Sequence, residues 1–183
     1  MSPATSAGLN RSQPYPKERN VKTLADAFEH TLRDVFHAEN AITKALPKMA
    51  AKAPDRALKA AFEEHLAETK EQIAILKRVF KSLGIEAKGE KCDAIEGLIK
   101  EGEGLMEEAS GTALSAGLLA LAQAVEHYEI ARYGTLREWA KALGHDDAAA
   151  MIGEILDMEK ACNSKLTGLA VDSINKTAKA KAA

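Results

Sequence analysis

The stretch 122-AQAVEHYEIARYGTL-136 repeats its apolar residues with the period of an α-helix. Extended in steps of three and four, the pattern gives one continuous stripe on one side of that helix. The stripe is apolar except for two acids one turn apart, and it consists of Leu119, Ala122, Glu126, Glu129, Tyr133, Leu136, Ala140 and Leu143. A stripe of this kind should face a protein core, so the two glutamates need an explanation.

The same helical periodicity of apolar residues, followed along the whole chain, predicts four long helices and no strands. They cover residues 23–53, 55–83, 112–143 and 146 to beyond 169, and Pro54, Gly84 and Gly144 mark three of the ends. Residues 84–111 contain six glycines and many charges. We interpret them as a long connection with a short helix around residues 93–99.

Two hairpins with short turns, joined by one long connection, are typical of an all-α four-helix bundle with a crossover. An array of helical repeats is the alternative, but two hairpins are too few for it. The chain of 183 residues is long enough for one domain with a sizeable core. We expect a flexible leader at residues 1–21, the bundle at residues 22–172 and a flexible basic tail at residues 173–183.

Composition excludes several classes of function. A net charge of −2 gives no general attraction to nucleic acid or to acidic membranes, so neither is an expected partner. No apolar run approaches the roughly 18–20 residues that span a bilayer, and the first twenty residues lack the apolar segment of a secretory signal. Two cysteines, Cys92 and Cys162, fit a reduced cytoplasmic protein better than a disulfide scaffold.

Each of the four predicted helices carries a glutamate in a core-facing stripe. They are Glu39, Glu68, the pair Glu126 and Glu129, and Glu159. The two halves of the chain also resemble each other, because 37-HAE-39 aligns with 127-HYE-129 at an offset of 90 residues. A spacing of 29 residues separates Glu39 from Glu68, and one of 30 separates Glu129 from Glu159. Similar hairpins should therefore bring these acids to a similar level of the bundle.

Burying unpaired carboxylates costs several kcal/mol each, so the acids must be protonated, paired with cations or bound to metal. The stripes place no lysine or arginine beside them. Oxygen donors suit iron, manganese or magnesium, and two divalent ions would nearly balance five carboxylates. The predicted ligands are Glu39, Glu68, Glu126, Glu129, Glu159 and His65. If the stripes are slightly rotated, each acid lies instead at a helix edge in solvent.

Several residues near these acids have more than one interpretation. His65 is a ligand, a hydrogen-bond donor to a ligand, or an ordinary core histidine. Glu71 and Gln72 are each within reach of the same site. The Tyr133 hydroxyl can donate to a carboxylate or simply pack in the core, and Cys162 reads as a small core residue. No phosphate-binding loop, nucleophile elbow or zinc-type Cys/His spacing is present in the sequence.

Four segments resemble the YciF/YciE-like group of the ferritin-like superfamily. They are 38-AENAITKALPKMA-50, 62-FEEHLAETKEQ-72, 124-AVEHYEIARYGTL-136 and 158-MEKA-161, and the resemblance covers roughly residues 22–170. It implies a ferritin-like bundle, a homodimer, a bacterial stress-response setting and a di-iron site of the ferroxidase type. The glutamate pair of the third helix also resembles the rubrerythrin arrangement. There the second and fourth helices carry Glu-x-x-His motifs, whereas Glu71 and Cys162 stand at the histidine positions here.

Three functions remain open at this stage. The first is oxidation of Fe(II) by dioxygen or peroxide at a site for two iron ions. The second is a non-enzymatic stress protein whose carboxylate cluster is structural or vestigial. The third is disproportionation of peroxide by two manganese ions, and it differs from the first only in the metal, because both metals accept this ligand set.

Overall fold

The structure, a computed structural model, describes residues 21–181 as helices joined by short connections. In order, these are α1 (Leu24–Lys52), α2 (Arg56–Ser82), α3 (Asp93–Glu108), α4 (Gly111–Ala142), α5 (Asp146–Leu169), a π-helical turn (Ala170–Ile174) and α6 (Asn175–Lys181). No strand occurs within this part of the chain, so the predicted all-α class is confirmed. The expected leader lies outside the described residues except for Val21.

Local sequence signals set the helix ends. Thr23 and Asp26 form a reciprocal capping box at the start of α1, and the Asp55 side chain accepts hydrogen bonds from the first backbone N–H groups of α2. Gly84 and Gly144 follow α2 and α4 with φ angles of 70° and 76°, a region that glycine occupies at little cost. Pro47 lies inside α1, which continues through it to Lys52.

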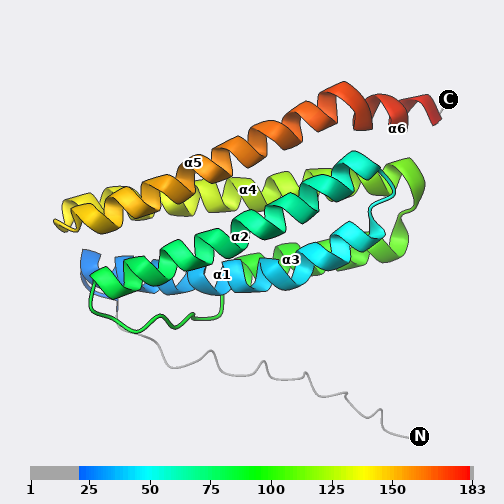
Figure 1. Ribbon diagram of the computed structural model, residues 1–183. Helices are drawn as coiled ribbons and strands as arrows, with labels where there is room; N and C mark the ends of the chain where they lie inside the picture. The colour runs from blue at the N-terminus through cyan, green and yellow to red at the C-terminus, as the bar shows by residue number, and fades with distance from the viewer. Residues whose placement is uncertain (1–20, 182–183) are drawn as a thin grey trace, which may run out of the picture.

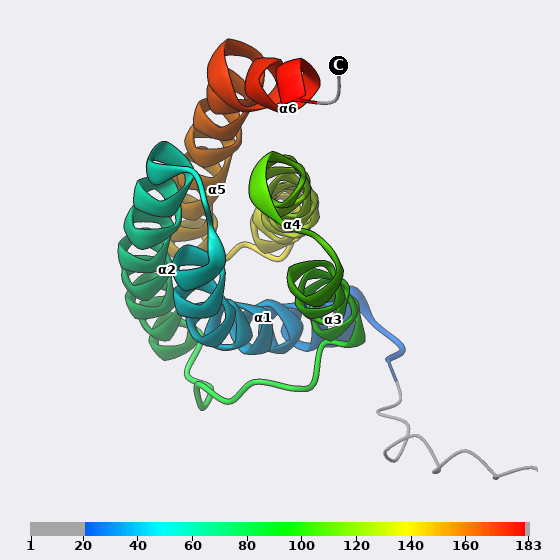
Figure 2. The same ribbon diagram turned by 90° about the vertical axis from the view of Figure 1, so that its right-hand side faces the viewer.

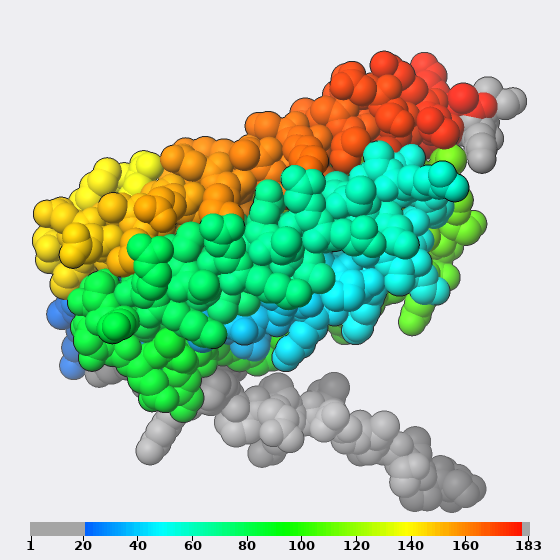
Figure 3. All heavy atoms as spheres, viewed as in Figure 1, coloured from blue at the N-terminus to red at the C-terminus, as the bar shows by residue number. Residues whose placement is uncertain are grey.

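The helices form two antiparallel hairpins packed against each other (Figure 1). α1 pairs with α2 and α4 pairs with α5, while α2 lies beside α5 and α1 beside α4. Figure 3 shows α2 and α5 side by side along one face, in green and orange. The predicted bundle of two hairpins joined by a crossover is therefore confirmed.

The crossover contains a longer helix than the sequence predicted. α3 runs to Glu108, whereas only residues 93–99 were expected to be helical. Gly102, one of the glycines that suggested a loop, instead permits close packing of α3 on α4, and Gly117 of α4 does the same from the other side. A Cβ atom on Gly102 would overlap the side chain of Leu121, and one on Gly117 would come 2.7 Å from the side chain of Leu105. Tertiary packing thus outweighs the poor helix propensity of glycine here.

α3 runs alongside α1 in the same direction. The backbone N–H of Glu90 donates to the carbonyl of Arg33 at 3.1 Å, His37 contacts Glu96 at 2.9 Å, and Lys48 contacts Glu103 at 2.9 Å. Viewed along the bundle, α3 covers the edge between α1 and α4 (Figure 2). The end of the chain bends through the π-helical turn, and α6 lies against α4. Residues 173–181 of the expected tail are thus helical in the structure.

The core consists of two apolar clusters, one toward each end of the bundle. One contains Leu46, Phe62 and Leu118, and the other contains Leu32, Phe80 and Ile152. Each of the four long helices passes from one cluster to the other, and each carries buried polar side chains at the junction. This polar layer contains Glu39, His65, Thr69, Gln72, Glu126, Glu129 and Glu159. None of the helices in residues 21–181 has the length and apolar character needed to span a bilayer.

Candidate metal centre

α4 contributes the two acids of the stretch 122–136. Glu126 and Glu129 are three residues apart, so their side chains leave the helix on the same face. The apolar stripe of α4 continues on both sides of them, with Ala122 before and Tyr133 after. Packing of that stripe holds both acids inside the bundle, where Glu126 is 0% and Glu129 is 1% exposed.

α1 contributes Glu39, which is fully buried at the same level. Its Oε1 accepts a hydrogen bond from the hydroxyl of Tyr133 on α4. The hydrogen-bonding interpretation of Tyr133 is therefore confirmed, and the tyrosine is also part of an apolar cluster. The charge of Glu39 is close enough to raise the pKa values of Glu129 and Glu159, so the three acids share one environment.

α2 contributes His65 and Gln72, which are two turns apart. Between them the inward position belongs to Thr69, whose hydroxyl donates to the His65 carbonyl at 2.8 Å. Nδ1 of His65 lies 3.4 Å from Oε1 of Glu126. The Gln72 amide donates to Oε1 of Glu159 at 2.7 Å. Both side chains therefore contact acids from the other hairpin.

α5 contributes Glu159 and, one turn later, Cys162. Glu159 is fully buried, and Cys162 is partly buried. The Cys162 thiol lies 3.2 Å from Oε1 of Glu126 and donates to it. The thiol thus serves as a hydrogen-bond partner of a carboxylate at the edge of the layer.

Four of these side chains can place one donor atom each around a single point. The donor atoms of His65, Glu126, Glu129 and Glu159 all lie within 4.8 Å of one another. A second, smaller group of the same kind contains His65, Glu126 and Cys162. The two hairpins meet in this cluster, because α2 supplies the imidazole and α4 and α5 supply the carboxylates.

Protein groups satisfy the carboxylates of this layer only in part. One oxygen of each of four acids is buried without a hydrogen-bond partner, namely Oε2 of Glu39, Glu126, Glu129 and Glu159. Lysine and arginine are absent from the buried side chains of residues 21–181. Buried polar atoms normally have partners, so four open oxygens in one layer are an arrangement that fits bound cations.

Burial also changes the protonation of the acids. It raises the pKa of Glu39 to about 8, against a lowering by the Tyr133 hydrogen bond, and the pKa of Glu126 to about 7. Burial and then the neighbouring acids raise the pKa values of Glu129 and Glu159 well above their ordinary range. Desolvation lowers the pKa of His65 to about 4, which leaves a neutral imidazole that can act as a ligand.

Comparison with known proteins places the chain in a family. Residues 23–179 match the family described as "Domain of unknown function (DUF892)". The chain belongs to the DUF892 family. It is 44% identical over 165 residues to Protein YciF of Escherichia coli (strain K12), across 89% of this chain and 99% of that protein. The resemblance of the four segments to the YciF/YciE-like group is thereby confirmed.

Two solved structures of relatives have the same fold. The E. coli stress protein YciF has 43% sequence identity and a TM-score of 0.82, and the match covers 85% of this chain and 99% of that one. YcfI of Rhodopseudomonas palustris, which is described provisionally as a structural protein, has 51% identity and a TM-score of 0.79 over 81% of this chain and 96% of that one. A Xanthomonas campestris protein has 20% identity and a TM-score of 0.67, so for that protein the similarity extends to the fold and no further.

Within this DUF892 chain, five of the six predicted site residues meet in the polar layer. They are Glu39, His65, Glu126, Glu129 and Glu159. The sixth, Glu68, is half-buried on α2 and is not one of the grouped donor residues, although its charge raises the pKa of Glu126. Thr69 takes the inward position because the buried face of α2 follows residues 65, 69 and 72. Glu71 is exposed.

Sequence reasoning missed the contact between Cys162 and Glu126 and the role of Thr69. It also missed Asn163, whose Oδ1 is buried without a partner one residue after Cys162. The signal available for Cys162 was its spacing of three residues from Glu159. That spacing marks the same helix face, but it does not reveal which side chain of α4 lies opposite.

Proposed function

We propose that this member of the DUF892 family binds two divalent metal ions, iron in the first place, in the polar layer between its two apolar clusters. The four buried carboxylate oxygens without partners carry the proposal. Glu126, Glu129, Glu159 and His65 would hold one ion, and the free oxygen of Glu39 would face a second. Two divalent ions bring four positive charges, which the four carboxylates balance.

The chemistry that suits this donor set is oxidation of Fe(II) as a substrate. Carboxylates stabilise Fe(III) more than Fe(II) because the trivalent ion gains more from each negative ligand. Two Fe(II) ions give up one electron each, and dioxygen takes both electrons and two protons to form hydrogen peroxide. With hydrogen peroxide as the oxidant, the same two electrons and two protons yield two water molecules. Manganese fits the same ligands and would support peroxide disproportionation instead.

The protein's own residues would handle protons and geometry in this reaction. Metal binding requires ionised carboxylates, so the acids would release their protons as the ions enter. Tyr133 would then keep Glu39 in position through its hydrogen bond, and Gln72 would do the same for Glu159. Neither of these neighbours carries a charge that competes with a cation.

A non-enzymatic role is the second candidate. The structural description given to the R. palustris relative supports it, and so do Glu71 and Cys162 at the positions where rubrerythrin-like motifs have histidine. In this role a bound ion would only neutralise the acids and stabilise the bundle. The stress-response setting suggested by the E. coli relative is compatible with both roles.

We further propose a cytoplasmic homodimer. Both cysteines are free thiols, as expected for a reducing compartment. The homodimer rests on the family resemblance, and light scattering of the purified protein measures it directly.

Metal analysis and iron oxidation test the proposed function together. Protein purified without chelator should contain close to two equivalents of metal, and metal-free protein should oxidise added Fe(II) faster than buffer does. Glu39→Gln and Glu129→Gln should both reduce oxidation to the buffer rate. Glu154→Gln, which changes an exposed carboxylate of α5, is the matched control and should behave as wild type. Metal binding without faster oxidation would favour the non-enzymatic role, and the absence of metal binding would reject the proposed metal centre.

A further inference from the structure

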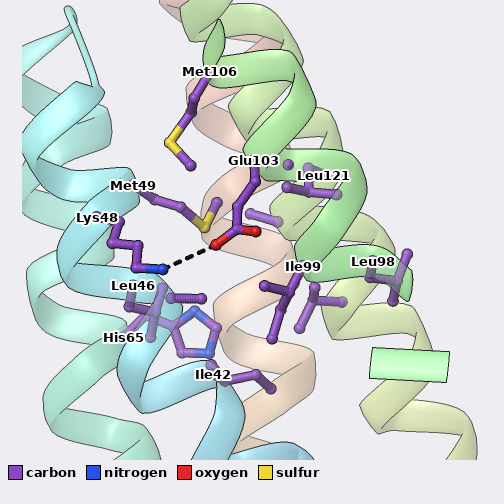
Figure 4. A pocket seen from close by; sticks show the side chains of 14 residues that line it. Ile42, Leu46, Lys48, Met49, His65, Leu98, Ile99, Glu103, Met106 and Leu121 are labelled. Atoms are coloured by element: carbon purple, nitrogen blue, oxygen red, sulfur yellow. Dashed lines mark hydrogen bonds and ion pairs between the residues drawn. The ribbon is translucent and has the colours of Figure 1, made fainter. Parts of the chain in front are cut away.

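A narrow apolar cavity lies beside the polar layer, between α1, α3 and α4. Its volume is about 30 Å³, and fourteen residues line it (Figure 4). Apart from Lys48, Glu103 and His65 the lining is apolar, and it includes Ile42, Leu46, Met49, Leu98, Met106 and Val125. The cavity exists because α3, the helix of the crossover, covers the edge between α1 and α4 without filling the space beneath it.

The two ends of the cavity differ in exposure. Lys48 on α1 and Glu103 on α3 form an ion pair at 2.9 Å, and their side chains are 61% and 47% exposed, so they mark the end at the surface. His65 is only 4% exposed and marks the inner end. In Figure 4 the ion pair bridges the two helices, and the imidazole lies below it in the view, next to Ile42 and Leu46.

His65 connects this cavity to the candidate metal centre. It lines the cavity, and it also belongs to the group of donor residues with Glu126, Glu129 and Glu159. A molecule that passes between the apolar walls therefore arrives at the imidazole and, next to it, at the carboxylates.

The size and chemistry of the cavity restrict what can enter. A cavity needs about 10–15 Å³ to hold one water-sized molecule, so a volume of about 30 Å³ leaves room for a small molecule such as dioxygen. Cations would lose their hydration shell, and hydrogen peroxide its hydrogen bonds to water, along walls that offer no replacement before His65. Dioxygen is small, neutral and apolar, so it has no strong interactions with water to lose on entering the cavity.

We propose that this cavity is the route by which dioxygen reaches the carboxylate cluster, which makes dioxygen the oxidant of the reaction proposed above. The inference rests on that proposed function. Met49 and Met106 contribute flexible thioether side chains to the walls, so rotation about their side-chain bonds opens the passage without moving a helix. Iron ions enter by another way, because the apolar walls exclude them.

Substitutions that fill the cavity test this route. Ala45 lines the cavity and is partly exposed on α1, so the three extra carbons of Ala45→Leu fill the space while the outer side can relax. Leu98→Phe blocks the cavity from α3 and guards against a folding defect particular to position 45. Ala27→Leu is the matched control, since Ala27 is also a partly exposed alanine of α1 but does not line the cavity.

The first measurement is independent of catalysis. Crystals pressurised with xenon, an apolar probe of gas sites, should show a xenon atom in the cavity of wild type and of Ala27→Leu. Ala45→Leu and Leu98→Phe should both lose it. Absence of xenon from the wild-type cavity, or its persistence in both blocked variants, would overturn the inference.

The second measurement compares two oxidants. At low dioxygen concentration, both blocked variants should oxidise Fe(II) several-fold more slowly than wild type and Ala27→Leu. With hydrogen peroxide as the oxidant, and in binding of Mn(II), all four proteins should agree. Wild-type rates with dioxygen in both blocked variants would overturn the inference and leave the proposed function intact. If wild type oxidises Fe(II) with neither oxidant, the proposed function itself fails.

Discussion

The stability of the metal-free protein should fall as the pH rises from 6.5 to 7.5. The acids of the polar layer have pKa values raised by burial, to about 8 for Glu39 and about 7 for Glu126, from an ordinary value of 4.5. In this pH range the unfolded chain has already released these protons, whereas the folded protein still holds most of them. A raised pKa of this kind stabilises the fold fully only below pH 4.5, and the contribution is lost as the pH rises toward the folded value.

The expected slope follows from proton counting. Each proton held only by the folded state lowers the free energy of unfolding by about 1.4 kcal/mol per pH unit. Glu39 alone predicts nearly that slope, and Glu129 and Glu159, whose pKa values are raised further, make it steeper. His65 has the opposite effect, because its lowered pKa of about 4 favours the fold as the pH rises toward 6.5. Above pH 6.5 that opposing effect fades, so the carboxylates decide the sign.

Urea unfolding in the presence of a chelator, at several pH values between 6.5 and 7.5, measures the slope. Glu129→Gln should reduce it by up to about 1.4 kcal/mol per pH unit, since glutamine has the same size and no proton to release. Glu154→Gln on the exposed side of α5 should leave it unchanged. Saturating Mn(II), which binds the ionised carboxylates, should flatten or reverse the slope. A flat or rising stability in the metal-free wild type would refute the view that these acids are protonated without metal.

Two further predictions concern packing and hydrogen bonding. Tyr133→Phe removes the donor to Glu39, so it should destabilise the protein by about 1–3 kcal/mol in urea unfolding and shift Mn(II) binding to higher pH; equal binding curves for the variant and wild type would contradict this role. Gly102→Ala should lower the melting temperature, because the new methyl group overlaps the end of the Leu121 side chain and the overpacking cost of about 1–3 kcal/mol outweighs the gain in helix propensity. Gly104 lies on the same helix with open space around its Cα. Gly104→Ala should therefore raise the melting temperature, because alanine stabilises the helix by up to about 1 kcal/mol relative to glycine. The same sign for both alanine variants would show that Gly102 is not held by packing.

Periodicity predicted the fold well because the apolar stripes are long and the turns have strong signals. The stripe from Leu119 to Leu143 and the glycines after α2 and α4 locate helix faces and ends from local sequence alone. The length of α3 was not predictable in this way, since Gly102 looks like a helix breaker until the opposing Leu121 is known. Local propensity carries no information about a partner helix twenty residues away.

For the candidate site, the sequence predicts which helix face carries each acid, but not which side chains of the other helices lie opposite it. Glu126 and Glu129 stand out because they interrupt an apolar stripe, and the structure brings them together with Glu159 and His65. Glu68 fits an equally good stripe in the sequence, yet the small rotation of α2 that buries Thr69 leaves Glu68 half-buried. A rotation of this size depends on how α2 packs against α5, so the sequence of one helix cannot specify it.

The donor set itself favours particular metals. Among the candidate donors of the polar layer there are four carboxylates and one imidazole. The remaining candidate donor, Cys162, has a thiol whose pKa is raised by burial and by the charge of Glu126. A protonated thiol is a poor ligand and a good hydrogen-bond donor, in keeping with its contact to Glu126. Zinc and copper draw their protein selectivity from thiolate and imidazole ligands, whereas hard oxygen ligands suit iron and manganese. Glu71 is exposed and the Cys162 thiol is protonated, so neither residue at the histidine positions of the rubrerythrin-like motifs adds a nitrogen ligand, and the centre is rich in oxygen donors. Such a centre should bind Fe(III) more tightly than Fe(II), and this difference in binding is the thermodynamic drive for the proposed oxidation.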